Sequence, residues 1–205
     1  MGIQQLPING ITAVLRYKDR FVFEVSKPKY WTKDNDGNTL IGIKCIGGAP
    51  KGQESLMEAL ERELREEISI KAELTSGLSP FFINMNMSVI DPAPSSYFFP
   101  DAYFTWEYRH PSEHGVICTY IGDIRDVPKP NDVFGLVLCH PDDLMKHVIR
   151  QTPLEECDEL EFWYTQKILV PLKAKISVLG EVRRLAVLYS SYPHLYRRIY
   201  FQCEK

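Results

Sequence analysis

The stretch that decides the fold reads Gly47-Gly48-Ala49-Pro50-Lys51-Gly52-Gln53-Glu54 and continues over residues 55–70 as SLMEALERELREEISI. Glycine and proline interrupt regular elements, so we expect the chain to turn sharply here, with its backbone open to close approach. From about Gln53 onward the residues are strong helix formers. The stretch therefore predicts a turn followed by a helix that ends near Ile70.

The predicted helix has one apolar face and a row of carboxylates beside it. The apolar residues recur at three- and four-residue steps, which is typical of a helix packed on a core: Met57, Leu60, Leu64 and Ile68. Glu63 and Glu67 lie one turn apart at the edge of that face, with Glu66 a little further round. Carboxylates at this spacing repel one another and weaken a helix by a few tenths of a kcal/mol. A divalent cation reverses this effect, because Mg²⁺ takes carboxylate oxygens as ligands.

The spacing of the polar residues is more informative than their number. The stretch fits the pattern G-x5-E-x7-R-E-U-x-E-E, where U is aliphatic, with Gly48, Glu54, Arg62, Glu63, Leu64, Glu66 and Glu67 at the fixed positions. Residues of six fixed types, each at roughly one position in fifteen, would coincide by chance on the order of once in ten million windows. A solvated acidic face would not require this spacing. The pattern is the Nudix box, and the chain resembles a Nudix hydrolase.

The resemblance implies a role for each residue of the box. Glu63 and Glu67 would be metal ligands, together with the carbonyl oxygen of Gly47. Glu66 would bind a second metal ion or act on the first through water. Arg62 would orient the glutamates, with Glu54 as its partner. The implied cofactor is Mg²⁺, with Mn²⁺ as an alternative.

The general base is left open by the resemblance, because some members of the family use a box glutamate and others an acidic residue on a distant loop. Glu107 and Glu113 are the candidates outside the box. A carboxylate bound to Mg²⁺ is a poor proton acceptor, which favours a residue outside the box. We favour Glu113, which precedes a predicted strand, because Glu107 is expected to point to solvent between Trp106 and Tyr108.

Residues 84–114 are rich in proline and aromatic residues and predict a long loop. Such a loop in a compact domain is usually functional or disordered, and its aromatic content argues against disorder. We expect a lid on which a base stacks, with Tyr103 and Trp106 as substrate-binding residues. Alternatively, these rings pack on the core or form a dimer surface.

The remaining pattern predicts an α/β protein. Apolar runs before and after the box predict strands, the first two forming a hairpin over 11–26, and residues 141–150 predict a helix. The resemblance implies the Nudix fold, a mixed β-sheet sandwiched between helices, for a domain over residues 1–150. From Pro153 the chain looks helical, including a helix over 172–192, so residues 151–205 predict a helical C-terminal extension. It would pack on the same domain or form a homodimer contact.

One box position departs from the family pattern. The family usually has glycine where this chain has Ser69. Glycine closes a helix in the left-handed conformation, and serine pays on the order of 1 kcal/mol there. We therefore expect the helix to end by a different turn.

Composition excludes several classes of protein. The chain has 205 residues, 44% of them hydrophobic, and a formal net charge of −3, which gives no general attraction to nucleic acid or to anionic membranes. Its cysteines, Cys45, Cys118, Cys139, Cys157 and Cys203, contain no CxxC pair and predict buried, reduced thiols. We found neither a signal peptide nor an apolar run near the ~18 residues of a membrane span, so a cytoplasmic location is expected.

These observations favour Mg²⁺-dependent hydrolysis of a diphosphate linkage, with a nucleoside diphosphate linked to another moiety as substrate. Two alternatives belong to other classes. A non-catalytic nucleotide-sensing Nudix module predicts loss of box glutamates, and none is lost. An isoprenoid diphosphate isomerase would need a catalytic cysteine in a polar pocket, for which Cys45 is the candidate.

Overall fold

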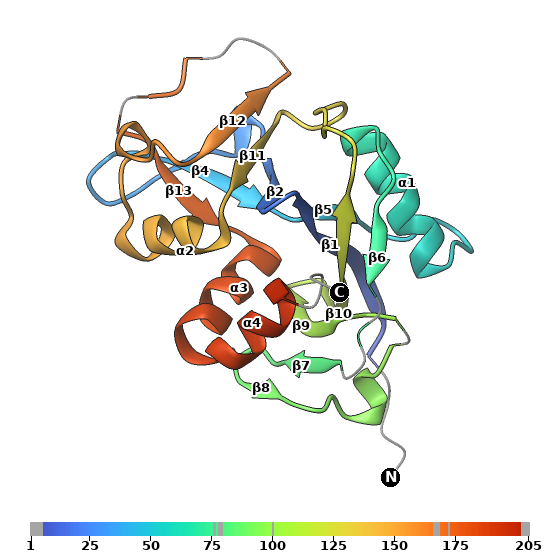
Figure 1. Ribbon diagram of the computed structural model, residues 1–205. Coiled ribbons are helices and arrows are strands. Elements are labelled where there is room, and N and C mark those ends of the chain that lie inside the picture. The colour runs from blue at the N-terminus through green and yellow to red at the C-terminus, as the bar shows by residue number, and fades with distance from the viewer. Residues whose placement is uncertain are drawn as a thin grey trace.

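The computed structural model describes residues 6–75, 77, 80–99, 101–165, 169–171 and 173–201. Its strands form one mixed sheet with helices on both sides (Figure 1). The strands are β1 (Ile8–Tyr17), β2 (Arg20–Val25), β3 (Thr32–Lys33), β4 (Thr39–Lys44), β5 (Ile46–Gly48), β6 (Glu73–Thr75), β7 (Phe81–Ile83), β8 (Val89–Ile90), β9 (Phe104–His110), β10 (Glu113–Ile124), β11 (Gly135–Cys139), β12 (Glu161–Tyr164) and β13 (Lys175–Val178). The α-helices are α1 (Leu56–Ile68), α2 (Pro141–Arg150), α3 (Gly180–Ser191) and α4 (Pro193–Phe201).

Strand β1 shows how the two faces of the sheet are used, because successive side chains of a strand point to opposite faces. Ile11, Ala13 and Leu15 pack with the apolar face of α1. Val14 packs in the cluster that contains α2, α3 and α4. On that same face Arg16 donates from Nη1 to the carbonyl of Tyr200 in α4, at 2.6 Å. The prediction of a mixed sheet between helices is confirmed.

The predicted hairpin is present, and the second half of the predicted aromatic loop is a strand. β1 and β2 pair antiparallel, as predicted, and β1 also pairs in parallel with β10. Residues 104–110 are not part of a loop, because they form β9, which pairs antiparallel with β10. The prediction of one long loop over 84–114 is therefore wrong in its second half. The alternation of Phe104, Thr105 and Trp106 suits a strand whose partner lies later in the chain.

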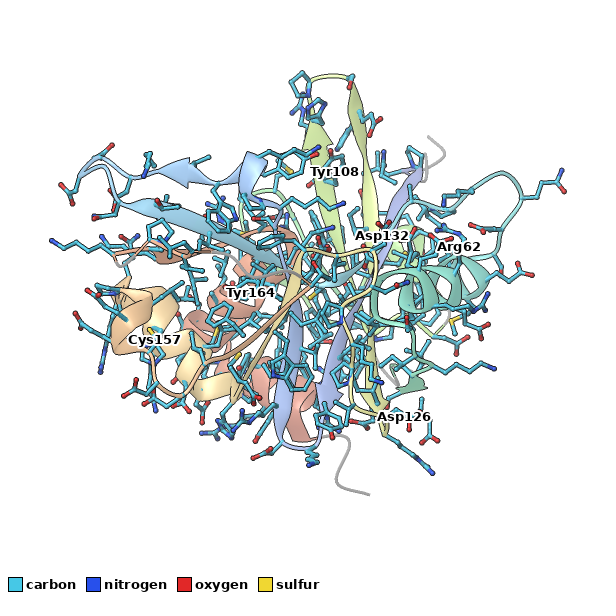
Figure 2. All side chains as sticks on the ribbon, turned by 90° about the horizontal axis from the view of Figure 1, so that it is seen from above. Arg62, Tyr108, Asp126, Asp132, Cys157 and Tyr164 are labelled. Carbon is cyan, nitrogen blue, oxygen red and sulfur yellow. The ribbon has the colours of Figure 1, made fainter. Side chains whose placement is uncertain are left out.

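The C-terminal segment also differs from the prediction. It contributes β12, which pairs with β11, and β13, which pairs in parallel with β4. The helix begins at Gly180, and residue 172, where it was predicted to begin, lies outside the described residues. The short apolar run over 175–178 fits a helix or a strand equally well by periodicity, and only the edge of β4 decides between them. In Figure 2, Cys157 of this segment and Arg62 of α1 lie on opposite sides of the molecule.

Helix α1 is closed at both ends by specific contacts. Ser55 and Glu58 form a capping box, in which the Ser55 hydroxyl accepts from the Glu58 N–H and the Glu58 carboxylate accepts from the Ser55 N–H. The helix ends at Ile68, and Ser69 follows in the left-handed conformation with φ of 59°. The expectation of a different turn is wrong. Serine adopts the conformation that glycine would take.

A loop from the other side of the sheet covers the C-terminal end of α1. Backbone N–H groups of Asn131 and Asp132 donate to the carbonyls of Glu67 and Glu66 at 2.8 and 3.2 Å. The side chain of Asn131 donates to Glu66 O as well, at 2.8 Å. Carbonyls that a helix end leaves unpaired are thus satisfied. The segment that carries the box glutamates is therefore held by this loop as well as by the turn before α1.

The cysteines for which the structure gives a position, Cys45, Cys118, Cys139 and Cys157, are free and buried, as predicted. Cys203 lies outside the described residues. Within the described part of the chain, no helix has the length and apolar character to cross a membrane.

The left-handed residue after α1 makes a direct prediction about stability. Ser69→Gly should raise the free energy of unfolding by up to about 1 kcal/mol, because glycine relieves the Cβ clash of that conformation. Ser69→Ala is the matched control, since it removes the hydroxyl and keeps Cβ. Urea unfolding should show stabilisation for glycine alone, and equal stability of the two variants would contradict the assignment.

Candidate active site

The sequence prediction of a turn at Gly47 and Gly48 is wrong for these two residues, because they end β5 and pair with Thr12 and Ile11 of β1, and the turn follows at Gly52 and Gln53. We use the name glycine turn for Gly47, Gly48 and the bend after them, which lie between β1 and α1. Gly47 has φ of +148°, and a Cβ built there would lie 2.7 Å from Cα of Thr12. A Cβ on Gly48 would lie 2.7 Å from Cδ of Glu63. The contact with backbone excludes a side chain at Gly47, whereas a Cβ at Gly48 would displace the end of the Glu63 side chain. The two glycines are therefore needed so that the turn can sit between the sheet and the Glu63 carboxylate.

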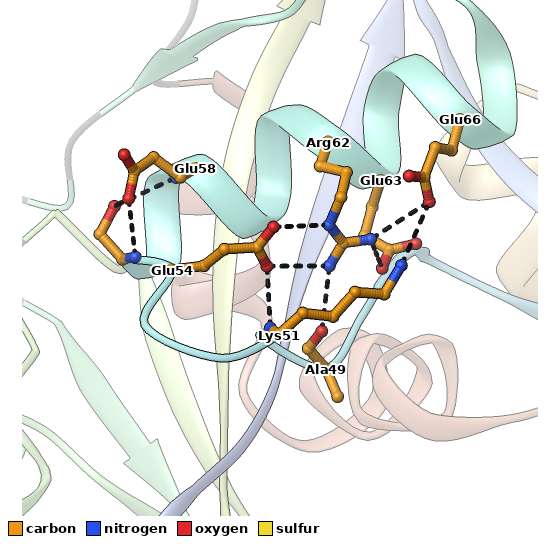
Figure 3. A network of polar contacts seen from close by, with 8 residues as sticks. Ala49, Lys51, Glu54, Glu58, Arg62, Glu63 and Glu66 are labelled. Carbon is orange, nitrogen blue, oxygen red and sulfur yellow. Dashed lines mark hydrogen bonds and ion pairs between the residues drawn. The ribbon is translucent and has the colours of Figure 1, made fainter.

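Arg62 joins the residues of the box into one network (Figure 3). Its guanidinium donates to both oxygens of Glu54, from Nε at 2.8 Å and from Nη2 at 3.1 Å. Nη1 donates to Glu63 and, at 3.2 Å, to Glu66. Nη2 also reaches the carbonyl of Ala49 in the turn, at 3.1 Å. Because the guanidinium is planar and presents several N–H donors, one arginine can orient three carboxylates.

The charges in this network shift two pKa values in opposite directions. The hydrogen bond from Arg62 lowers the pKa of Glu54, and the bond with Glu54 raises the pKa of Arg62. Lys51 adds a backbone N–H to the Glu54 carboxylate, at 2.8 Å. Figure 3 shows that Glu54 meets Arg62 on the turn side of α1, while Glu66 lies further along the helix. The structure thus brings Arg62, Glu54, Glu63 and Glu66 together, as the sequence predicted.

Glu67 lies in a more buried position and contacts the turn by itself. Its Oε2 accepts from the backbone N–H of Gly47 at 3.1 Å. Burial raises the pKa of Glu67 to about 8, and the charge of Glu24 adds to the effect. Glu24 is 6% exposed and forms an ion pair with Lys44 at 2.8 Å. Glu67 therefore lies in a small cluster of opposite charges behind the turn.

The donor set fits a hard divalent cation. Glu63, Glu66, Glu67 and the Gly47 carbonyl would supply only oxygen atoms, which Mg²⁺ and Mn²⁺ accept. The burial that raises the pKa of Glu67 would be offset by a cation beside it. No group of three histidine, cysteine or acidic side chains is already gathered in metal-binding geometry within the residues described. Glu63 and Glu66 are instead directed toward Arg62, so binding an ion requires their carboxylates to reorient.

A cleft of about 270 Å³ opens beside the turn. Its wall includes β1, β5, the β9–β10 hairpin and the start of α3, through Thr12, Gly47, Gly48, Tyr108, Glu113 and Glu181. A larger cavity, of about 640 Å³, is lined by residues of α2, α3 and α4 and by no box residue. We assign the site to the smaller cleft, because it alone of the two borders the glycine turn.

The two acidic candidates outside the box occupy different positions. Glu113 is exposed at the rim of the cleft, where its Oε2 accepts from Asn9 at 3.4 Å. Glu107 accepts from the N–H of Met85 at 3.0 Å and contacts His114 at 2.8 Å. Glu107 therefore joins neighbouring segments and does not point freely to solvent, contrary to expectation. Glu113 is the one of the pair that lines the cleft.

The two rings chosen as substrate-binding residues lie in the core. Tyr103 and Trp106 are 2% and 5% exposed. The Tyr103 hydroxyl donates to the carbonyl of Arg198 at 2.8 Å, and the Arg184 guanidinium lies 3.4 Å from the centre of the Trp106 ring. Stacking of a base on these faces is not compatible with that burial, so the expected lid role is corrected. Tyr108, two residues further along β9, is the half-buried ring that lines the cleft.

The sequence did not single out Lys44, Glu24 or Glu181. Glu24 and Lys44 are charged residues in largely apolar strands, and Glu24 and Glu181 are close to the box only through the fold. The one signal available was a lone charge in an apolar run, as for Glu24 in RFVFEV and Lys44 in TLIGIK. A buried charge of this kind is rare unless it is paired or functional.

Solved structures similar to this chain are hydrolases of one family. No protein-family model and no curated protein matches the chain. A NUDIX-family hydrolase from Clostridium perfringens is 14% identical, with a TM-score of 0.44 over 70% of this chain and 87% of that one. The Ap4A hydrolase of C. elegans is 13% identical, with a TM-score of 0.41 over 68% and 86%. The dihydroneopterin triphosphate pyrophosphohydrolase of E. coli is 11% identical, with a TM-score of 0.40 over 67% and 83%. Because these values are low, we base the functional proposal on the residues of this chain.

The burial of Trp106 can be tested by stability. Trp106→Ala should lower the free energy of unfolding by about 3–5 kcal/mol, because it removes a large core side chain and the surface on which Arg184 stacks. Tyr108→Ala, on the same strand and half-buried, should cost clearly less. Denaturant unfolding of both variants measures the difference. Equal costs would mean that Trp106 is not a core residue.

The raised pKa of Glu67 predicts a pH dependence of stability in chelator-treated protein. Between the ordinary value of 4.5 and about 8, folded Glu67 keeps a proton that the unfolded chain has lost, so the free energy of unfolding falls as pH rises. Glu67→Gln should remove this component of the slope, whereas Glu61→Gln, an exposed residue of the same helix, should retain it. Addition of Mg²⁺ should flatten the slope in wild type. A slope unchanged by Glu67→Gln would show that the Glu67 pKa is ordinary.

Proposed function

We propose that this chain is a Nudix-type pyrophosphohydrolase that cleaves a diphosphate linkage in a nucleoside diphosphate linked to another moiety, with Mg²⁺ or Mn²⁺ as its metal. The observation that carries the proposal is the contact of two box carboxylates with one glycine turn. Glu63 lies against Gly48, and Glu67 accepts from the Gly47 N–H. Both carboxylates thus lie against Gly47 and Gly48, the residues through which the box borders the cleft.

The chemistry of a diphosphate explains why such a site is useful. Its negative oxygens repel a nucleophile, and the leaving phosphate must accept an electron pair. When bound, a divalent cation neutralises these oxygens and lowers the pKa of a coordinated water. The contribution of the chain is to keep the ligand residues beside the turn, from where the Glu63 and Glu66 carboxylates reorient to bind the ion. Arg62 does this for Glu63 and Glu66, and the Gly47 N–H does it for Glu67.

Lys44 adds a positive charge to the same cleft. Its side chain is 39% exposed and faces three carboxylates, those of Glu24, Glu67 and Glu181. Burial lowers its pKa, yet these negative charges outweigh burial and the net shift is upward. Lys44 therefore stays charged at neutral pH and suits an anionic substrate.

The nucleoside would lie toward the aromatic side of the cleft. Tyr108 is the ring available there, and Leu179 and Ile117 provide apolar surface next to it. This replaces Tyr103 and Trp106 as the surface for a base. The sequence prediction that Glu113 accepts the proton stays a prediction, supported by its place on the cleft wall.

Two alternative functions are less well supported. A nucleotide-sensing module would not need the network that Arg62 maintains among the box glutamates. An isomerase would need a reactive thiol, but Cys45 is 1% exposed and burial raises its pKa well above the usual value. A neutral, enclosed thiol is a poor catalyst.

The proposal predicts that Glu63→Gln and Glu67→Gln each lower turnover by roughly two orders of magnitude or more, because each removes a ligand of a cation that supplies several kcal/mol to the transition state. Glu61→Gln is the matched control on the same helix and should keep wild-type turnover. The assay is release of phosphate or nucleotide from a panel of nucleoside diphosphate derivatives, with Mg²⁺ and with Mn²⁺. Tight binding of a substrate without turnover by wild type would favour the sensing module.

A further inference from the structure

The C-terminal segment adds a buried carboxylate to the cleft. Glu181 stands in the first turn of α3, is 5% exposed and lines the cleft together with Gly47 and Gly48. The start of this helix is fixed to the sheet, since the N–H of Leu179 donates to the carbonyl of Ile43 at 2.9 Å. The position of Glu181 is therefore set by β4, the strand that also carries Lys44.

The residues of the cleft wall place Glu181 near the glycine turn. Glu181 and Thr12 line the same cleft, and the Thr12 hydroxyl shares a hydrogen bond with that of Thr119 at 3.1 Å. Thr12 lies opposite Gly47 in the pairing of β1 with β5, and Gly47 donates to Glu67. Glu181 therefore lines the same cleft as Gly47, whose N–H contacts the box carboxylate of Glu67.

The positively charged side chains near Glu181 have other partners, so its carboxylate is available to a substrate in the cleft. Arg184 follows one turn later, but its donors go to the carbonyls of Gly180 and Glu107, and it stacks on Trp106. Lys44 faces Glu181 from β4 and shares its charge with Glu24 and Glu67. The thiol of Cys45 next to it is neutral.

The protonation of Glu181 agrees with this placement. Burial raises the pKa of the carboxyl to about 7, against the lowering effects of its own backbone N–H, of Arg184 and Lys44, and of Thr12. A proton acceptor works best when its pKa is near the operating pH. The box glutamates are directed toward Arg62 and the turn, and Glu113 is exposed at the rim.

We infer that Glu181 is the general base of the hydrolysis, which rests on the function proposed above. The oxygen of a water molecule forms a bond to phosphorus while the bond between phosphorus and the bridging oxygen breaks. The electron pair of the broken bond leaves with the departing phosphate, and the water proton passes to the Glu181 carboxylate. The C-terminal segment would then supply a reacting group as well as a cover for the sheet.

The test compares Glu181→Gln and Glu181→Asp with wild type and with Glu156→Gln, an exposed control in the same segment. Activity against the best substrate of the panel is measured as a function of pH, together with melting temperature and Mn²⁺ affinity. Glu181→Gln should lower kcat by about 10²–10⁴-fold with Mn²⁺ affinity unchanged, and the acidic limb of the pH profile should disappear. Glu181→Asp should keep the acidic limb at a reduced rate, which a purely structural role would not predict.

Other outcomes separate the inference from the proposed function. Wild-type hydrolysis with near-normal kcat in Glu181→Gln would overturn the inference and leave the function standing. A fall in Mn²⁺ affinity parallel to kcat would overturn it as well, by making Glu181 a metal ligand. Loss of the acidic limb in Glu113→Gln, with the limb kept in Glu181→Gln, would return the role to Glu113. If Glu181→Gln does not fold, an unchanged rate and limb in folded Glu181→Asp would overturn the inference. Absence of hydrolysis by wild type would overturn both.

Discussion

The close approach of the glycine turn to β1 is the constraint on which the rest of the site depends. A Cβ on Gly47 would collide with the backbone of β1, and a Cβ on Gly48 would collide with the Glu63 carboxylate. Because the glycine turn packs between β1 and α1, these contacts fix the position of α1 relative to the sheet. Arg62 then bridges the turn and the helix through Ala49 and Glu54. Packing and polar contacts thus specify the same arrangement.

The sequence predicted the parts of the fold that local pattern controls. The hairpin, the box turn and helix and α2 depend on turn residues, caps and one apolar face, which neighbouring residues report directly. Residues 175–178 were misjudged because their strand is defined by a partner far away in the chain, β4. Residues 104–110 were misjudged although their partner β10 follows directly, because the prolines and aromatic residues around them indicated a loop. Ser69 was misjudged for another reason, since contacts at the end of α1 outweigh its local preference.

The difference between features set by neighbouring residues and features set by distant segments applies to the site as well. Box residues lie within one turn and one helix, so their spacing was enough to bring Arg62 together with Glu54, Glu63 and Glu66. Glu181 reaches the cleft only through the pairing of β13 with β4, which no local pattern reveals. Lys44 lies shortly before Gly47 in the sequence and was missed as a single charge at the end of an apolar strand. The aromatic residues show the limit of composition as a guide. Trp106 and Tyr108 lie on the same face of β9, yet Arg184 covers Trp106 and leaves Tyr108 at the cleft.

The parallel pairing of β13 with β4 has a consequence for the order in which the molecule is made. Residues 39–44 leave the ribosome well before their neighbours 175–178 and the start of α3 are synthesised. Contacts between such distant segments form slowly, because a long loop must close first. The cleft wall is therefore missing while the rest of the sheet can already assemble. A nascent chain that displays the complete box would still lack the Glu181 wall of its cleft until β13 and the start of α3 have docked.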